Sequence, residues 1–212
     1  GAKGDVIRTL PIAQVLKKES HHITWITKPN MTELLADHPN IDSLISSTEE
    51  IKDSFDVLYN FDIEEEATNL AEKITAEKKL GFYKEGDFVQ AYNLGAEYYL
   101  NTIFDDETKK TNRKTYQEMM FAAAEIPYEL DKPVVYLKEK DREYAKEFLE
   151  KKNVLEKKII GIHVGASPRW PSKVWHKERI KLFIQKAKSQ NYEVLLFGGP
   201  VEEDQQNQHA TE

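Results

Sequence analysis

Short apolar segments alternate with helical patterns along most of this chain, and this alternation constrains the fold more than any single motif. Five runs have the composition of strands, at 22–27, 41–45, 55–61, 78–82 and 133–137. Four stretches between or after them have helical spacing, at 31–38, 64–74, 93–104 and 113–126. Strands that alternate with helices are typical of βα units with a parallel sheet. The first part of the chain is therefore predicted to be an α/β unit.

The pattern changes after this unit. Lys and Glu dominate residues 138–158, and an apolar strand at 159–163 then runs into a loop of small residues. A helix at 176–188 and a strand at 192–198 follow. We expect a boundary between 140 and 157, giving domains 1–150 and 151–212. Two strands are too few for an independent α/β core, so the second domain is predicted to be the start of a larger lobe.

Composition excludes several classes of function. Asp and Glu outnumber Lys and Arg by 37 to 30, and this net charge of −7 opposes nucleic-acid binding. The chain has no cysteine, which excludes disulfides and thiolate metal sites and fits a reducing compartment. No apolar run approaches the roughly 20 residues that span a bilayer.

The opening residues "GAKGDVIRTLP" predict a glycine-rich loop that leads into a helix. Gly1 and Gly4 allow backbone angles that other residues avoid, and Asp5 stands directly before an apolar helical pattern. One interpretation of Asp5 is a helix cap. The other is a functional carboxylate in a loop at the edge of a sheet.

A second loop, "HVGASPRWPSKVW" at 163–175, follows the apolar strand of the second domain. Loops at the carboxyl ends of parallel strands are where α/β proteins bind anions. Backbone N–H groups, the Ser167 hydroxyl and the cations Arg169 and Lys173 could converge there on a diphosphate. The alternative is a polar loop whose tryptophans pack in a core. Neither the dinucleotide fingerprint nor the Walker loop is present.

Four stretches in this order resemble glycosyltransferase family 9, the ADP-heptose lipopolysaccharide heptosyltransferases: "GDVIRTLP", "NRKTYQEMMFAAAEIPY", "IIGIHVGAS" with "KVW", and "FGGPVEED". The resemblance implies a GT-B type α/β fold of two Rossmann-like lobes, of which the second is incomplete in this chain. Residues 1–150 would then be the acceptor-binding lobe, and residues 151–212 the start of the lobe that binds the nucleotide sugar.

The resemblance also implies an activity. It predicts an inverting, metal-independent glycosyltransferase that moves heptose, or a related sugar, from an ADP-sugar to a lipopolysaccharide core acceptor. The ADP-sugar is a substrate, and no cofactor is expected. The partners implied are this donor and a lipid-linked oligosaccharide, in the cytoplasm at the inner face of the membrane; contact with the membrane surface itself is left open.

The resemblance assigns roles to single residues. Asp5 matches the family's catalytic acid and would act as the general base that deprotonates the acceptor hydroxyl. Arg8, three residues further on, could reach an anionic group of the acceptor, or could form a surface salt bridge instead.

On the donor side, Ser167 falls in the phosphate-binding loop and Lys173 matches the diphosphate lysine. Arg169 could share or take over that role, because the loop is longer than the family pattern. Glu202 matches an acid that contacts the ribose of the nucleotide.

Competing interpretations remain beside these. A non-catalytic sugar- or nucleotide-binding protein, or a sugar-nucleotide epimerase, would share the architecture. Asp62 and Glu64 resemble the Asp-x-Asp metal motif of other glycosyltransferases, but Asp62 is better explained as a helix cap. No two of the six histidines are spaced for a metal site on a helix. The tyrosines at 92, 98 and 99 could stack on sugars, and helical spacing favours packing for Tyr98 or Tyr99.

Overall fold

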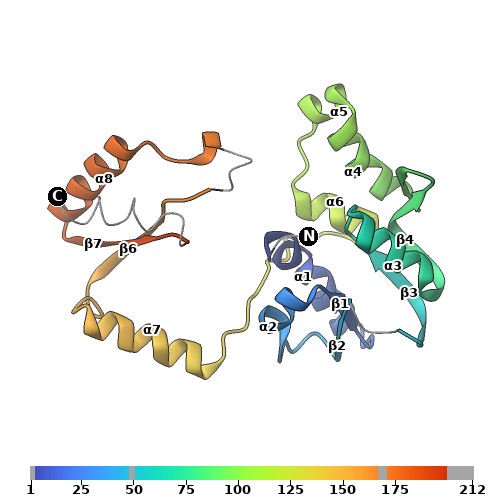
Figure 1. Ribbon diagram of the computed structural model, residues 1–212, viewed down its shortest axis with the longest axis horizontal. Coiled ribbons are helices and arrows are strands. Elements are labelled where there is room, and N and C mark those ends of the chain that lie inside the picture. Colours follow the sequence, from blue (N-terminus) through green and yellow to red (C-terminus); the bar gives the residue numbers. More distant parts are fainter. Residues whose placement is uncertain (1–2, 48–50, 167–170, 200–212) are drawn as a thin grey trace. The chain divides into compact units, whose positions relative to one another are not determined.

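The structure is a computed structural model that describes residues 3–47, 51–166 and 171–199. It divides into two units, Gly1–Tyr136 and Leu137–Glu212, each of which is described by itself (Figure 1). Helices alternate with mostly parallel strands in both units. The predicted α/β class is confirmed. The division lies ahead of the boundary expected from sequence, so the Lys- and Glu-rich helix groups with the second unit.

Unit 1 begins with helix α1 (Lys3–Lys18), which is followed by strand β1 (Thr24–Thr27), the short helices η1 (Pro29–Met31) and α2 (Thr32–Leu35), and strand β2 (Ser43–Ser46). β1 and β2 are parallel, with Thr24 opposite Ser43.

The start of α1 differs from the sequence prediction. Gly4 and Asp5 lie in the first turn of the helix rather than in a loop. A carboxylate is favoured in a first helical turn, where the backbone N–H groups lack partners within the helix.

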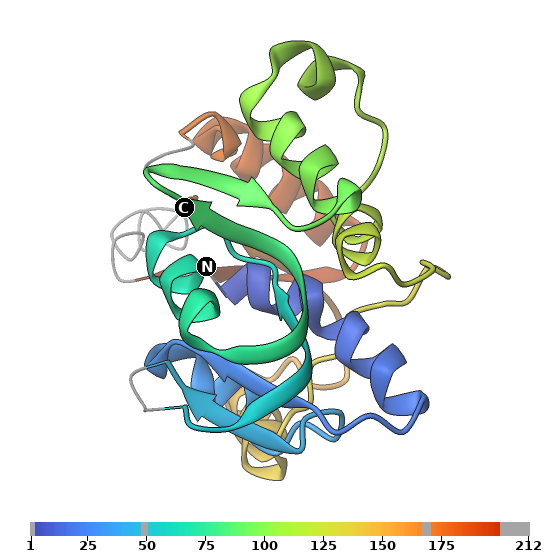
Figure 2. The same cartoon turned by 90° about the vertical axis from the view of Figure 1, so that its right-hand side faces the viewer.

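The second half of unit 1 contains strands β3 (Ser54–Asn60), β4 (Thr75–Glu85) and β5 (Phe88–Ala91), with helix α3 (Glu65–Lys73) between β3 and β4. β3 and β4 are parallel, whereas β4 turns back into β5 through a tight hairpin at Gly86 (Figure 2). Helices α4 (Leu94–Phe104), α5 (Asp106–Thr111) and α6 (Tyr116–Ala124) complete the unit.

The strand predicted at 133–137 is wrong, because residues 126–138 form neither helix nor strand. The apolar run is partly exposed, and Tyr136 packs edge-on against the buried ring of His38, with centroids 4.8 Å apart. β-branched residues favour an extended backbone, but a strand also needs a partner strand to pair with.

The core of unit 1 lies where α1, α4 and α6 meet β4. Phe82 of β4 and Met120 and Phe121 of α6 are fully buried there. Gly95 lets α4 approach α6 closely, since a Cβ at this position would lie 2.2 Å from the carbonyl oxygen of Ala122. The packing of the helices therefore depends on a residue without a side chain.

Unit 2 contains helix α7 (Glu139–Lys151), strand β6 (Lys158–His163), the short helix η2 (Pro171–Lys173), helix α8 (Lys177–Ser189) and strand β7 (Tyr192–Phe197). β6 and β7 are parallel, as the sequence predicts, with Lys158 opposite Tyr192. Across the described residues of both units, no helix combines the length and apolar character that a membrane crossing requires.

Replacing Gly95 by alanine tests the close approach of α4 and α6. We expect Gly95→Ala to lower the free energy of unfolding by about 1–3 kcal/mol, because the new methyl group overlaps the backbone of α6. Gly4→Ala is the matched control: it also lies in a first helical turn, and its Cβ would meet nothing within 4 Å. The control is expected to be neutral or slightly stabilising in denaturant unfolding; equal losses in both variants would contradict the packing argument.

Candidate active site

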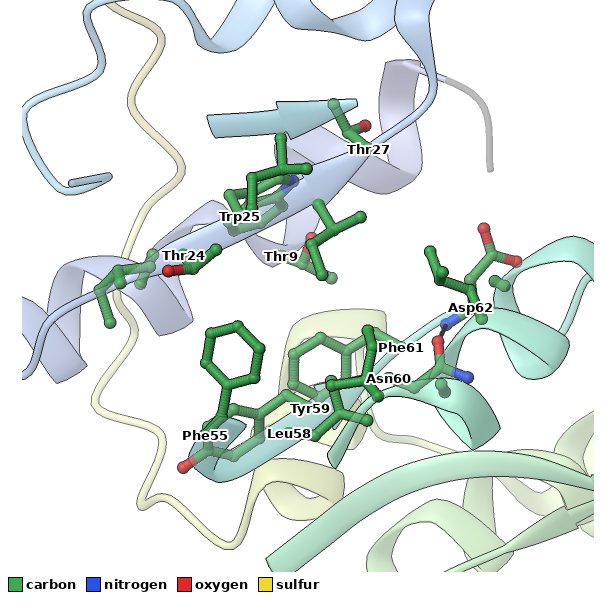
Figure 3. Close-up of a pocket in the computed structure, with 18 of the residues that line it drawn as sticks. Thr9, Thr24, Trp25, Thr27, Phe55, Leu58, Tyr59, Asn60, Phe61 and Asp62 are labelled. Atoms are coloured by element: carbon green, nitrogen blue, oxygen red, sulfur yellow. Dashed lines mark hydrogen bonds between the residues drawn. The ribbon is translucent and has the colours of Figure 1, made fainter. Parts of the chain in front are cut away.

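A cavity of about 990 Å³ lies in unit 1 between β1 and β3, and residues of α1 and α3 also line it. Figure 3 shows Thr9 of α1 between Trp25 of β1 and Leu58 of β3. Every residue of both strands lines this cavity. Because successive side chains of a strand point to opposite faces, consecutive lining residues indicate that the strand edges border the space. The cavity is a gap between two sheet edges rather than a hollow on one face.

An ion pair marks the carboxyl end of this gap. Lys28 follows β1, Glu64 follows β3, and the two pair with Nζ 2.6 Å from Oε2, so both strands have their carboxyl ends at the same edge. The hydrogen bond between the two side chains raises the pKa of Lys28 and lowers the pKa of Glu64. The carboxyl edge is where α/β proteins place their ligands. This end is therefore the candidate site.

Asp5 in the first turn of α1 and Asp62 just beyond β3 both line the cavity. Asp5, Asp62 and Arg8 also all act on the pKa of Tyr116, so the start of α1 lies near this edge. The Arg8 guanidinium pairs with the Asp5 carboxylate, and its Nε–H also donates to the carbonyl oxygen of Gly4 at 3.3 Å. Both side chains are a little over two-fifths exposed. The pair remains accessible to a ligand, and it brings together the two unit 1 residues that the sequence predicts as functional.

Arg8 is also held from its other side by an aromatic ring. Its guanidinium carbon lies 3.8 Å from the ring centroid of Tyr116, the first residue of α6. Tyr116 meets Tyr99 edge-on at 5.7 Å, and Tyr99 packs against the fully buried Phe82 at 5.4 Å. A row of rings thus runs from the core to Arg8. We call Phe82, Tyr99 and Tyr116 the aromatic row.

Burial dominates the electrostatics of this row. It raises the pKa of the Tyr116 phenol well above its ordinary value, with smaller effects from Tyr99, Arg8, Asp5 and Asp62. The pKa of Tyr99 is raised for the same reason. Both phenols stay neutral at physiological pH, so the charges at the site come from carboxylates and cations.

Asp62 is positioned just beyond β3. The buried Asn60 side chain donates to the carbonyl oxygen of Phe82 at 2.8 Å and accepts from the Asp62 N–H at 3.1 Å. The Asp62 carboxylate in turn accepts from the N–H of Glu64 at 3.0 Å. The cap position of α3 is Glu64, so the predicted cap is off by two residues: Asp62 forms a turn that leads into the helix.

Of the predicted donor-side residues, the structure describes Lys173, which is exposed at the end of η2. Ser167, Arg169 and Glu202 lie outside the described residues. Trp175 packs against Phe183 at 5.4 Å and remains partly exposed.

The tyrosines considered for sugar stacking pack within the protein instead. Tyr92 stacks on Tyr83 at 4.5 Å, Tyr99 belongs to the aromatic row, and the hydroxyl of Tyr98 donates to Asn112 at 2.8 Å. Sequence analysis assigned no role to Tyr116. The signal was present, because Tyr116 lies inside the quoted stretch "NRKTYQEMMFAAAEIPY", but nothing in the spacing connects it to Arg8.

Comparison with known proteins decides the family. The model described as glycosyltransferase family 9 (heptosyltransferase) matches residues 47–212. The chain belongs to glycosyltransferase family 9. The family 9 match begins after α1, so Asp5 and Arg8 lie outside it. A search of curated proteins found no match.

Two solved structures share the fold. The crystal structure of the glycosyl transferase family 9 from Veillonella parvula DSM 2008 is similar with a TM-score of 0.77 and 21% identity, over 100% of this chain and 64% of that one. E. coli ADP-heptose lps heptosyltransferase II is similar with a TM-score of 0.60 and 16% identity, over 99% and 65%. This chain thus spans somewhat less than two thirds of the length of these family 9 structures.

The cap at the start of α6, directly before Tyr116, can be tested by its contribution to stability. Thr115 caps the helix, accepting from the N–H of Glu118 at 3.2 Å while the Glu118 carboxylate accepts from the Thr115 N–H at 2.5 Å. We expect Thr115→Ala to lower the free energy of unfolding by about 1 kcal/mol, because the cap is lost. Thr115→Ser keeps the hydroxyl and should unfold in denaturant like the wild type. An alanine variant as stable as the serine variant would show that the cap contributes nothing.

Proposed function

We propose that the protein transfers a sugar from a nucleotide diphosphate donor to an acceptor hydroxyl, with Asp5 as the general base. The observation that supports this most is the place of Asp5, at the carboxyl edge beside β1 and β3 with Arg8 as its partner. Membership of glycosyltransferase family 9 supplies the reaction class.

In this reaction the acceptor oxygen attacks the anomeric carbon while the Asp5 carboxylate takes the hydroxyl proton. The bond from the anomeric carbon to the diphosphate oxygen breaks, and the diphosphate leaves with the electron pair. Attack from the face opposite the leaving group inverts the anomeric centre. A carboxylate suits the role of base because it accepts hydrogen bonds only and can take up one proton.

The leaving diphosphate gains negative charge, which cations and N–H groups must stabilise. We assign this role to Lys173, with Ser167 and Arg169 as further contacts and Glu202 on the ribose. With these groups the proposal needs no metal ion and no cofactor. Ser167, Arg169 and Glu202 lie outside the described part of the chain.

The substrates proposed are ADP-heptose, or a related ADP-sugar, and a lipopolysaccharide core acceptor, met at the cytoplasmic face of the membrane. The support is the heptosyltransferase description of the family and the similarity to ADP-heptose lps heptosyltransferase II. Arg8 would bind an anionic group of this acceptor, because a guanidinium matches phosphate and carboxylate oxygens in pairs.

The direct test is incubation of the full-length protein with ADP-heptose and truncated core acceptors, with mass spectrometry of the products. The acceptor is expected to gain the mass of one heptose. Asp5→Asn should lower kcat by about 10²–10⁴-fold, because the base is lost. Asp106→Asn is the matched control, since it makes the same change in the first turn of α5 and should leave kcat unchanged.

Three outcomes would contradict this proposal. Conversion of the donor to another nucleotide sugar without any acceptor would indicate an epimerase. Tight binding of ADP with no transfer to any core acceptor would indicate a binding protein. Transfer that persists undiminished in Asp5→Asn would remove Asp5 from the role of base.

Lys173 gives a second prediction, on donor binding alone. We expect Lys173→Ala to raise the Kd for ADP about tenfold or more, because a hydrogen bond to a charged group is lost. Lys186→Ala removes a cation from the last turn of α8 and should not change the Kd. Isothermal titration calorimetry measures both, and equal affinities in the two variants would exclude Lys173 from the diphosphate site.

A further inference from the structure

The contact between Arg8 and Tyr116 has no role in the reaction described so far. The ring of Tyr116 covers one face of the guanidinium at 3.8 Å, while the Asp5 carboxylate and the Gly4 carbonyl oxygen take N–H groups at its edge. A guanidinium has five N–H donors in one plane. A ring that fixes this plane also fixes the directions in which all five donors point.

Tyr116 is well suited to fix that plane, because its own position is set by the core. It is the first residue of α6, directly after the Thr115 cap. Tyr99 meets it edge-on, and Tyr99 rests on the fully buried Phe82. A tyrosine held in this way loses little further freedom when a ligand binds to its partner.

The surrounding charges explain why a fixed cation is needed here. Asp5, Asp62, Glu64 and Glu66 all line the cavity or flank its carboxyl end. Lys28 is paired with both Glu64 and Glu66, at 2.6 and 3.2 Å. An anionic ligand that approaches Asp5 is repelled by these carboxylates unless a cation is held toward it. Arg8 is a cation in contact with Asp5.

We propose that Tyr116 is a positioning residue that holds Arg8 ready to bind an anionic group of the acceptor, and so selects anionic over neutral acceptors. This inference rests on the proposed transferase function. It adds a residue that the transfer mechanism does not name, and it identifies the acceptor class by a phosphate or carboxylate close to the hydroxyl that reacts. Stacking on an aromatic ring is a property of arginine that a lysine reproduces poorly.

Tyr116→Leu tests the proposal, because it keeps an apolar side chain and removes the π face. The probes are a phosphorylated truncated core acceptor, the same acceptor after phosphatase treatment, and its carboxyl-reduced form. We expect the ratio of KM for the neutral form to KM for the anionic form to fall about tenfold, in line with the strength of a partly desolvated cation–π contact. A fall in the ratio measured with the phosphatase-treated acceptor would identify a phosphate as the group that Arg8 binds. A fall in the ratio measured with the carboxyl-reduced acceptor would identify a carboxylate.

Two variants separate this role from simple packing. Tyr116→Phe keeps the ring and should keep the wild-type ratio. Tyr98→Leu is the matched control. Tyr98 lies on helix α4, and its ring also has a cation over it, the ammonium of Lys114 at 4.3 Å from the ring centroid. This variant should leave the ratio unchanged. Circular dichroism and Tm verify that each variant folds.

The outcomes distinguish this inference from the function on which it rests. If the wild type transfers sugar and Tyr116→Leu changes both KM values equally, Tyr116 only supports the fold and the inference fails. A loss in Tyr116→Phe as large as in Tyr116→Leu would assign the effect to the hydroxyl and also overturn it. If the wild type transfers no sugar, the proposed function fails, and calorimetric binding of the phosphorylated and dephosphorylated acceptors to wild type and Tyr116→Leu still decides the selectivity claim.

Discussion

The stacking of Arg8 on Tyr116 is the interaction on which the candidate site depends. Arg8 carries its charge beside Asp5, and the aromatic row joins that charge to the core. An exposed ion pair by itself is held weakly, because solvent screens it and two side chains must be ordered. The ring beneath the guanidinium and the cap ahead of it give this pair a defined place. The site is therefore a product of α6 and β4 as much as of α1.

The sheet explains why the polar groups gather where they do. β1 and β3 end at the same edge, and residues that follow them, Lys28 and Asp62, line the cavity together with Asp5 of α1. The rest of the cavity is a gap between two strand edges, where exposed backbone groups favour pairing with an extended chain over binding of a small polar ligand. The size of the cavity is therefore a poor guide to function in this unit, and the candidate site occupies its carboxyl end.

Sequence patterns predicted the elements that depend on local periodicity. The strands at β1, β3, β6 and β7 and the helices α3, α4, α6 and α8 correspond to predicted runs. The strand predicted at 133–137 does not form, because an apolar run becomes a strand only where another strand is available to pair with it. The rest of the fold decides whether such a partner is present. Asp5 could be named from sequence because it matches the acid of the family's Gly-Asp-Val motif, and Arg8 because it follows three residues later. Tyr116 could not, because it lies more than a hundred residues from Arg8 and only the packing of α1 on α6 brings them together.

The most direct measurement is a crystal structure of the complete protein with a donor analogue and an acceptor bound. The account predicts one Asp5 carboxylate oxygen at about 2.6–3.2 Å from the acceptor hydroxyl that reacts, with Arg8 still stacked on Tyr116 and directed at an anionic group of the acceptor. An acceptor bound elsewhere, with Asp5 engaged only with Arg8 and no hydroxyl within reach, would contradict it.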